Sequence, residues 1–407
     1  MTGTLSPFPT EVVGRMAAGD KSTVMAGAPM VAEIAARYAD EAESARRLSP
    51  QVVEAVRDAG FARHFVPRAH GGEAGGFAEV TSAVGLVGEG CTSAAWAASL
   101  AAYAGRYGAF LPEEGQADIW ADGPDALLAG ALMPSGKAEP VAGGWRLSGE
   151  WKYISGVHFA DWALACAAVP TEGPVDPDAR PEVRFFAVPR ADFAIEDSWF
   201  TVGMRGTGSD TLLLADAFVP EHRTLARSAV HAGRAPASDA RCHLVPMYAV
   251  SALPFAAPLV GAVRGALRAW IARTGARVDR RGQSVGEKPS TQVALARSAA
   301  EVDAAELLIL RTAAVADGTV HVPDGEAAVR GARDLALAVE LLVSAVDRVF
   351  RAGGTSGQSS SDPVQRFWRD VNSAASHVAL SFETTGAAYG AWALGGGEGA
   401  GAVAAVH

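Results

Sequence analysis

The chain has 407 residues, of which 49% are hydrophobic and 20% are charged, and its formal net charge is −10 at pH 7. This length is too great for one compact core and predicts a globular enzyme of two or three packed subdomains. Because nucleic acids and anionic membranes attract basic surfaces, the negative charge argues against either as the main partner.

Membrane insertion, export and metal binding are not expected. No apolar run of about 18 residues is evident, which predicts no membrane-spanning helix. The first residues lack the basic-then-apolar order of a signal peptide. Cys91, Cys166 and Cys242 are scattered and odd in number, so we expect buried thiols rather than disulfides or zinc ligands. These features predict a soluble cytoplasmic protein without a metal site.

Residues 1–125 are expected to form an N-terminal helical domain. Apolar residues recur at spacings of three and four from Met30 to Tyr38, and Ser49-Pro50 supplies a helix cap followed by proline at the first helical position. After a glycine-rich loop at 71–76, two further helices are expected over 77–87 and 93–110.

The hydrophobic period changes near Leu127 and predicts an antiparallel β domain of several short strands over residues 126–230. Within it, Gly143–Trp162 alternates apolar and polar residues as a strand hairpin does. This segment reaches a turn at Ser155-Gly156 and then enters a second apolar run.

Helical periodicity returns over residues 231–395 and predicts a C-terminal four-helix bundle, followed by a flexible glycine-rich tail at 396–407. The last bundle helix is expected over 363–392 and carries Arg369, Asp370 and His377. We expect Arg369 and Asp370 to form an ion pair that holds this helix.

This order of helices, β domain and four-helix bundle resembles the acyl-CoA dehydrogenase fold, an α+β architecture, over nearly the whole chain. Two motifs, VRDAGFARHFVPRAHGGEAGG at 56–76 and GMRGTGSDTLLLADAFVPEHR at 203–223, are similar to the family's early helix with its glycine loop and to its β-domain exit. The Arg-Gly-Thr-Gly-Ser turn is typical of the oxygenase branch, the two-component (group D) flavin monooxygenases.

The resemblance implies a flavin-facing segment at the end of the predicted hairpin. Trp151 would form an aromatic wall, Ser155 would be a catalytic hydrogen-bonding group near flavin N5, and Gly156 would let the backbone approach the ring. The alternative interpretation is a core tryptophan and an ordinary turn serine. Further candidates for binding the cofactor are Arg205 and Thr207, Arg281 in a cluster with Arg277 and Arg280, and the backbone of Gly353 and Gly354. A solvated arginine face and a plain interhelical turn remain the alternatives for the last two sets.

His377 stands where dehydrogenases of this fold often carry a tyrosine-glutamate pair. The resemblance implies it as the substrate-facing acid/base, which suits a phenolic or amine substrate. A histidine bonded within the bundle is the alternative, and Glu383 is a weaker candidate of the dehydrogenase type. Tyr103, His158 and Met133 are candidates for the substrate pocket. Tyr103 stands where some aromatic hydroxylases carry a histidine, which indicates a larger substrate.

No GxGxxG motif follows a predicted strand, so reduced flavin (FMN or FAD) is expected to come from a separate NAD(P)H:flavin reductase. The resemblance implies that reduced flavin and oxygen form a C4a-hydroperoxide in a dry pocket walled by the β domain and the bundle. We therefore expect hydroxylation of an aromatic or natural-product intermediate, for example in antibiotic biosynthesis, by a homotetramer. The alternatives left open are a flavin oxidoreductase acting on a thioester, an N-oxygenase of an amino sugar, and a non-catalytic paralogue.

Overall fold

The structure is a computed structural model that describes residues 22–170, 181–323 and 325–395. The described residues divide into two compact units. The first comprises 22–32, 77–92 and the chain from 248 onward, and the second comprises 33–76 and 93–247. The predicted tail at 396–407 lies outside the described residues, and the division into three domains at 125 and 230 stays a prediction.

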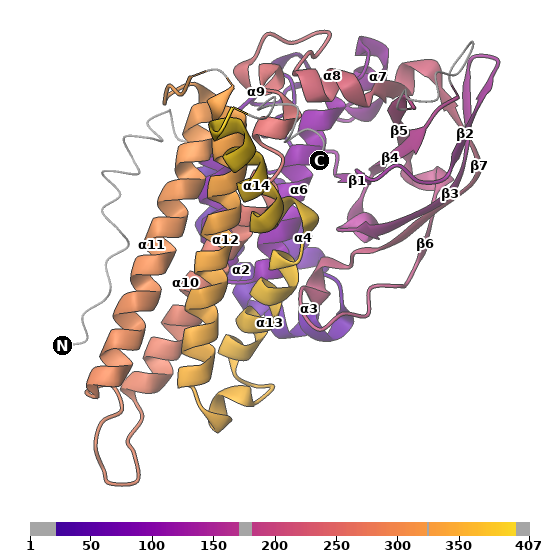
Figure 1. Ribbon diagram of the computed structural model, residues 1–407. Helices are drawn as coiled ribbons and strands as arrows, with labels where there is room; N and C mark the ends of the chain where they lie inside the picture. Colours follow the sequence, from indigo (N-terminus) through magenta and orange to yellow (C-terminus); the bar gives the residue numbers. More distant parts are fainter. Residues whose placement is uncertain (1–21, 171–180, 324, 396–407) are drawn as a thin grey trace. The chain divides into compact units, whose positions relative to one another are not determined.

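The first unit is helical. Figure 1 shows its long helices α10, α11 and α12 side by side. Its helices are α2 (Thr23–Arg37, which continues into the second unit), α5 (Phe77–Gly88), α10 (Leu253–Gly275), α11 (Pro289–Asp317), α12 (Glu326–Ala352), α13 (Pro363–Ala375) and α14 (Phe382–Ala393), with 3-10 turns η6 (Met247–Ala249), η7 (Thr355–Gln358) and η8 (Val378–Leu380). A Cβ at Gly261 would lie 1.9 Å from the carbonyl oxygen of Gly85, so α5 and α10 pack at backbone contact.

The helix predicted over 363–392 is interrupted, which corrects the sequence interpretation. The helix α13 ends at Ala375, and His377 has extended backbone angles (φ −64°, ψ 132°). The His377 side chain accepts a hydrogen bond from the backbone N–H of Ala379, and Ser381 caps α14 by accepting from Thr384. These side-chain acceptors compete with the helical backbone ladder and give the chain a turn in place of a continuous helix.

The segment Met247–Gly275 is long and apolar enough to cross a membrane by composition, with a mean hydropathy of 1.5 over its most apolar window. The sequence interpretation expected no such stretch, and this expectation was wrong. However, 94% of that window is buried inside the protein, as in the core helix of a packed bundle.

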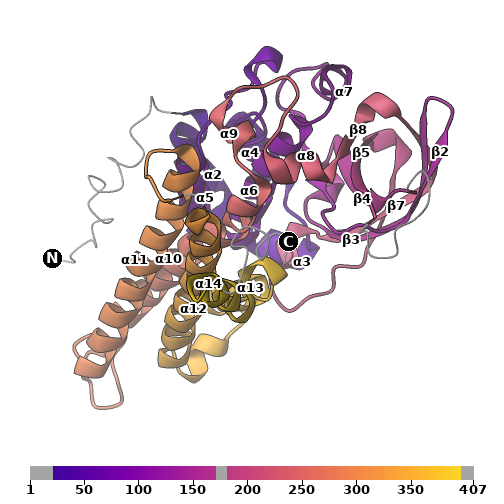
Figure 2. The same ribbon diagram turned by 45° about the horizontal axis from the view of Figure 1, so that its top comes forward.

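The second unit contains two four-stranded sheets with helices around them. One sheet has the order β1 (Leu128–Gly130), β4 (Trp162–Ala168), β5 (Val183–Pro189) and β8 (Thr224–Ala226), and the other has the order β2 (Lys137–Val141), β3 (Gly144–Ile154), β7 (Asp210–Pro220) and β6 (Ala194–Glu196). The helices and 3-10 turns of this unit are α3 (Ala39–Ala45), α4 (Pro50–Asp58), η1 (Arg68–His70), α6 (Thr92–Gly108), α7 (Glu113–Ile119), η2 (Val157–Phe159), η3 (Arg190–Asp192), η4 (Arg205–Thr207), η5 (Glu221–Arg223), α8 (Arg227–Ala232) and α9 (Arg241–Leu244). Figure 2 shows β4 and β5 as neighbours.

Two features of the β domain differ from the prediction. The strands β1 and β4 pair in parallel, so the first sheet is mixed rather than antiparallel. The strands β3 and β4 do not form a hairpin, because β3 is paired on one side with β2 and on the other with β7. The turn after Ile154 instead carries the chain from one sheet to the other, and apolar residues such as Leu147, Phe186 and Leu212 form a shared core.

His243 gives the second unit a pH-dependent stability. Its side chain is fully buried, with Nε2 2.6 Å from the carbonyl oxygen of Phe65 and Nδ1 2.6 Å from the hydroxyl of Ser238. Burial, helped by the Arg106 cation, lowers the pKa of His243. The unfolded chain therefore binds a proton at a pH where the folded chain does not.

We expect His243 to make its whole contribution to the free energy of unfolding above about pH 6.5. This contribution should fall as the pH drops toward the lowered pKa of folded His243, by at most about 1.4 kcal/mol per pH unit. Urea unfolding at pH 7.5 and 5.5 measures this difference. It should shrink in His243→Asn and persist in a variant of the exposed His321, His321→Asn. An unchanged difference in His243→Asn would contradict the assignment.

Candidate functional site

The turn after β3 has an unusual backbone. The register of β3 against β7 shifts between Trp151 and Ile154, and Tyr153 within this bulge has φ 67°. On the facing η4 turn, Met204 has φ 55°. Left-handed backbone at residues other than glycine costs about 1–3 kcal/mol each and concentrates at functional sites. Two such residues flanking one pair of turns mark this region as a candidate site.

Gly156 provides open space at this turn. It has φ 72°, and a Cβ built on it would have no atom within 4 Å among the described residues. Its backbone N–H donates to the carbonyl oxygen of Thr207 at 3.0 Å, which ties the β3 turn to η4. The turn is therefore held in place on one side and open to a ligand on the other.

A chain of hydroxyl groups starts at Ser155. The indole N–H of Trp96 donates to Ser155 Oγ at 3.1 Å, and Ser155 Oγ lies 2.7 Å from Ser209 Oγ. Ser209 Oγ lies 2.7 Å from Thr207 Oγ1, which donates to the carbonyl oxygen of Met204 at 2.8 Å. Thr207 and Ser209 are buried, whereas Ser155 is half-buried beside the open space. Ser155 is thus the least buried residue of this hydrogen-bonded chain.

The other predicted flavin-binding residues of this unit lie in different settings. Trp151 is 1% exposed in the core of the β domain, and its indole N–H donates to the carbonyl oxygen of Cys166. It offers no surface to a ligand, so the structure corrects its predicted role as a wall. Thr207 uses its hydroxyl inside the chain rather than toward a phosphate. Arg205 is half-buried, and its guanidinium lies 3.4 Å from a carboxylate oxygen of Glu43.

His158 is bonded to a buried carboxylate. Its Nε2 lies 2.7 Å from Asp210 Oδ2, and the other oxygen of Asp210 accepts the backbone N–H groups of Ser198 and Trp199. Burial raises the pKa of Asp210, but these hydrogen bonds outweigh it and the net pKa is lowered. His158, Asp197 and Asp210 place possible metal-ligand atoms within 4.8 Å of one another. Because each of the three already has a protein partner, we propose no metal there.

The two remaining candidates for the substrate pocket differ in exposure. Tyr103 is buried on α6 and meets the ring of Phe65 edge to face, with ring centroids 5.2 Å apart. Met133 follows β1 and is 73% exposed. Tyr103 on α6, Met133 after β1 and His158 in η2 therefore come from three separate elements.

In the first unit, His377 is oriented by its neighbours. Its imidazole stacks on Phe255 with centroids 3.8 Å apart, and Nδ1 accepts the backbone N–H of Ala379 at 3.2 Å. Because Nδ1 accepts, the hydrogen of the neutral ring resides on Nε2, which is a donor. His377 is half-buried at the break between α13 and α14, whereas Glu383 is exposed in the first turn of α14.

The backbone N–H groups of Gly353 and Gly354 are already bonded within the chain, which corrects their predicted role as a phosphate cradle. The backbone N–H groups of Gly353 and Gly354 donate to carbonyl oxygens of the last helical turn. The carbonyl oxygen of Gly353 accepts from Arg273 at 3.2 Å and from Arg277 at 3.3 Å. Burial and the neighbouring Arg277 cation lower the pKa of Arg273. Arg281 is exposed on the loop between α10 and α11.

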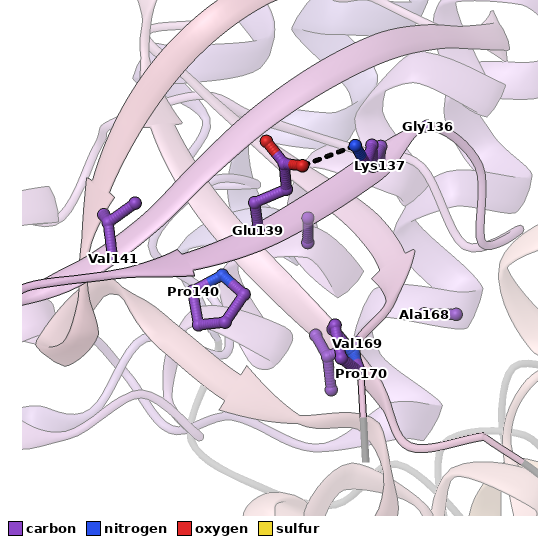
Figure 3. A pocket seen from close by; sticks show the side chains of 9 residues that line it. Gly136, Lys137, Glu139, Pro140, Val141, Ala168, Val169 and Pro170 are labelled. Atoms are coloured by element: carbon purple, nitrogen blue, oxygen red, sulfur yellow. Dashed lines mark ion pairs between the residues drawn. The ribbon is translucent and has the colours of Figure 1, made fainter. Parts of the chain in front are cut away.

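The β domain also carries a hollow of about 640 Å³ beside the edge strand β2 (Figure 3). Its charged lining residues, Lys137 and Glu139, form an ion pair with each other. It is lined by Gly136, the residues of β2, and residues 168–170. None of the residues predicted for the site lines this hollow.

Sequence reasoning missed three residues of the candidate site. Ser209 and Asp210 stand in the Arg-Gly-Thr-Gly-Ser-Asp motif that was recognised, and their polar side chains before an apolar strand could have indicated a role. Trp96 lies 59 positions before Ser155 and carries no local signal.

Comparison with known proteins agrees with this architecture. Residues 253–382 match the family described as "Acyl-CoA dehydrogenase, C-terminal domain". The FADH(2)-dependent resorcinol hydroxylase, oxygenase component, of Rhizobium sp. (strain MTP-10005) is 36% identical over 90% of this chain and 92% of its own length.

Two solved structures share the fold along almost the whole chain. The 3-HSA hydroxylase of Rhodococcus sp. RHA1 has a TM-score of 0.83 at 29% identity, covering 93% of this chain and 98% of its own. XiaF from Streptomyces sp., solved with FADH2 and glycerol, has a TM-score of 0.82 at 27% identity, covering 96% and 97%. The predicted order of helices and sheets is confirmed. The chain belongs to the family of flavin-dependent monooxygenase oxygenase components with the acyl-CoA dehydrogenase fold.

Proposed function

We propose that this protein hydroxylates a phenolic substrate with reduced flavin and oxygen, and that a separate NAD(P)H:flavin reductase supplies the reduced flavin. The proposal rests on the half-buried Ser155 hydroxyl, which lies next in the chain to the open space at Gly156. It also rests on the family to which the chain belongs. FAD is proposed before FMN because FADH2 is named for the resorcinol hydroxylase and for the structure of XiaF.

The residues at the turn fit a reduced flavin ring. Ser155 has donated its hydrogen within the hydroxyl chain and keeps a lone pair that can accept the N5–H of a reduced flavin. Gly156 leaves room for a flat ring to approach the backbone. When bound, reduced flavin supplies the two electrons with which one atom of O2 enters the substrate and the other becomes water.

His377 is proposed to bind the substrate through its Nε2 hydrogen. A neutral imidazole whose Nδ1 is occupied by the Ala379 N–H can donate to a phenolic or phenolate oxygen. Such a hydrogen bond orients the ring and favours the phenolate, whose proton has passed to solvent, over the neutral phenol. The phenolate has more electron density than the phenol at the ring carbons beside its oxygen. The predicted acid/base role thereby becomes the role of a fixed donor.

Exposed side chains of the helical unit bear on assembly and on phosphate binding. Val293 and Leu307 on α11 are 65% and 45% exposed, which supports the homotetramer that the family resemblance implies. Arg277 and Arg281 are exposed cations near the α10–α11 loop and are proposed to meet flavin phosphate. We also propose a cytoplasmic location and a place in antibiotic biosynthesis.

The purified protein, combined with an NADH:flavin reductase, FAD and resorcinol under ¹⁸O₂, should give a product that carries one ¹⁸O atom. Mass spectrometry of the product and an assay for hydrogen peroxide measure incorporation and uncoupling. Omitting the reductase while adding dithionite-reduced FAD should support a single turnover. If resorcinol and other phenols, including p-hydroxyphenylacetate, stimulate neither oxygen uptake nor ¹⁸O incorporation, the proposal of a phenolic substrate fails.

A further inference from the structure

The hydrogen bonds of the hydroxyl chain can be oriented in a single way. The carbonyl oxygen of Met204 can only accept, so Thr207 donates its hydroxyl hydrogen to it. Thr207 therefore accepts from Ser209, and Ser209, having donated its hydrogen, accepts from Ser155. At the other end, the indole N–H of Trp96 can only donate and takes one lone pair of Ser155. The hydrogen bonds of this chain therefore all point one way, from the indole N–H of Trp96 to the carbonyl oxygen of Met204.

This direction determines what Ser155 can offer to a ligand. Its one hydrogen is used toward Ser209 and one of its two lone pairs is used toward Trp96, so a single lone pair remains. Because hydrogen bonds in such a chain polarise one another, reversing one of them would disturb all of them. Ser155, the neighbour of Gly156 in the chain, consequently offers a ligand an acceptor and not a donor.

We propose that Ser209 and Thr207 are positioning residues that make the site selective for reduced over oxidised flavin, because they hold Ser155 as an acceptor. This inference rests on the proposed function. The N5 atom of a reduced flavin carries a hydrogen and can donate to Ser155. The N5 atom of an oxidised flavin carries only a lone pair, which would face another lone pair and leave both atoms without a partner. Such selectivity would favour binding of reduced flavin, the form that the reductase supplies.

Equilibrium dialysis under anaerobic conditions tests the inference with oxidised FAD and with dithionite-reduced FAD. We expect the wild-type protein to bind reduced FAD more tightly. In Ser209→Ala and in Thr207→Val, Ser155 becomes free to turn its hydrogen toward the ligand. The dissociation constant of oxidised FAD divided by that of reduced FAD should therefore fall about tenfold. For a two-electron couple, a tenfold change corresponds to a decrease of about 30 mV in the midpoint potential of bound FAD.

Two controls separate this effect from a general loss of structure. Ser209→Thr keeps the hydroxyl and should keep the ratio. Thr211→Val removes a buried hydroxyl that pairs with Ser198 at 2.7 Å outside the chain, and it should also leave the ratio unchanged. Equal binding of the two forms by the wild type, or an unchanged ratio in both Ser209→Ala and Thr207→Val, would overturn the inference while leaving the proposed function intact. If the wild type bound neither form of FAD, the proposed function itself would fail.

Discussion

Replacing His377 by alanine should lower kcat for hydroxylation of a phenol by about 10²-fold or more, the usual effect of removing a positioned proton donor or acceptor. The imidazole is held by stacking on Phe255 and by the Ala379 N–H, so the orientation of its ring is set before the substrate arrives. Reduced flavin should still be oxidised by O2, and hydrogen peroxide should replace the hydroxylated product. Parallel assays of product and peroxide measure this change.

Two further variants distinguish a donor from a general base. A glutamine at position 377 can place an N–H near the position of Nε2, so His377→Gln should retain more activity than His377→Ala. His377→Asn can restore only the acceptor that caps Ala379 and should resemble the alanine variant. His321→Ala, at an exposed site, serves as the control. A kcat for His377→Ala within threefold of the wild type would rule out the proposed role, and equal losses in the glutamine and alanine variants would favour a base.

Replacing Asp334 by alanine should destabilise the helical unit by about 3 kcal/mol. Asp334 is 2% exposed on α12, where Oδ1 accepts from Arg333 Nε at 3.0 Å and from Arg333 Nη2 at 2.6 Å. Its other oxygen forms an ion pair with Arg311 of α11. The Arg333 guanidinium also lies 4.1 Å from the ring centroid of Tyr389 on α14. One carboxylate therefore links three helices.

The expected loss has a specific electrostatic cause. Burial and the neighbouring cations of Arg330 and Arg333 already lower the pKa of Arg311, so removing Asp334 leaves half-buried positive charge without its carboxylate partner. For an unfolding unit of about 150–250 residues, the size range of the helical unit, this loss lowers the Tm by about 6–12 °C. Glu340→Ala, at an exposed position of the same helix, should shift it little. A decrease of less than about 2 °C in Asp334→Ala would show that the ion pairs contribute no net stability.

The sequence alone determined the order of elements and the family. Hydrophobic periods are local properties, so α5 and α6 could be predicted close to their actual bounds, and the β region and the return to helices after it could be located along the chain. Strand partners are not local. The parallel pairing of β1 with β4 and the separation of β3 from β4 depend on which edges are free once β2 and β7 have paired.

The same distinction holds within the candidate site. The motif around Ser155 and the histidine at 377 could be recognised as residues, because their neighbours in the chain carry the resemblance. Their chemical states could not be recognised. Ser155 is an acceptor because Trp96, Thr207 and Ser209 are brought to it from distant positions. His377 is a donor because the chain leaves the helix one residue earlier and places the Ala379 N–H on Nδ1. Sequence periodicity thus determined which elements form, whereas hydrogen-bond direction arises only where the tertiary structure brings donors and acceptors together.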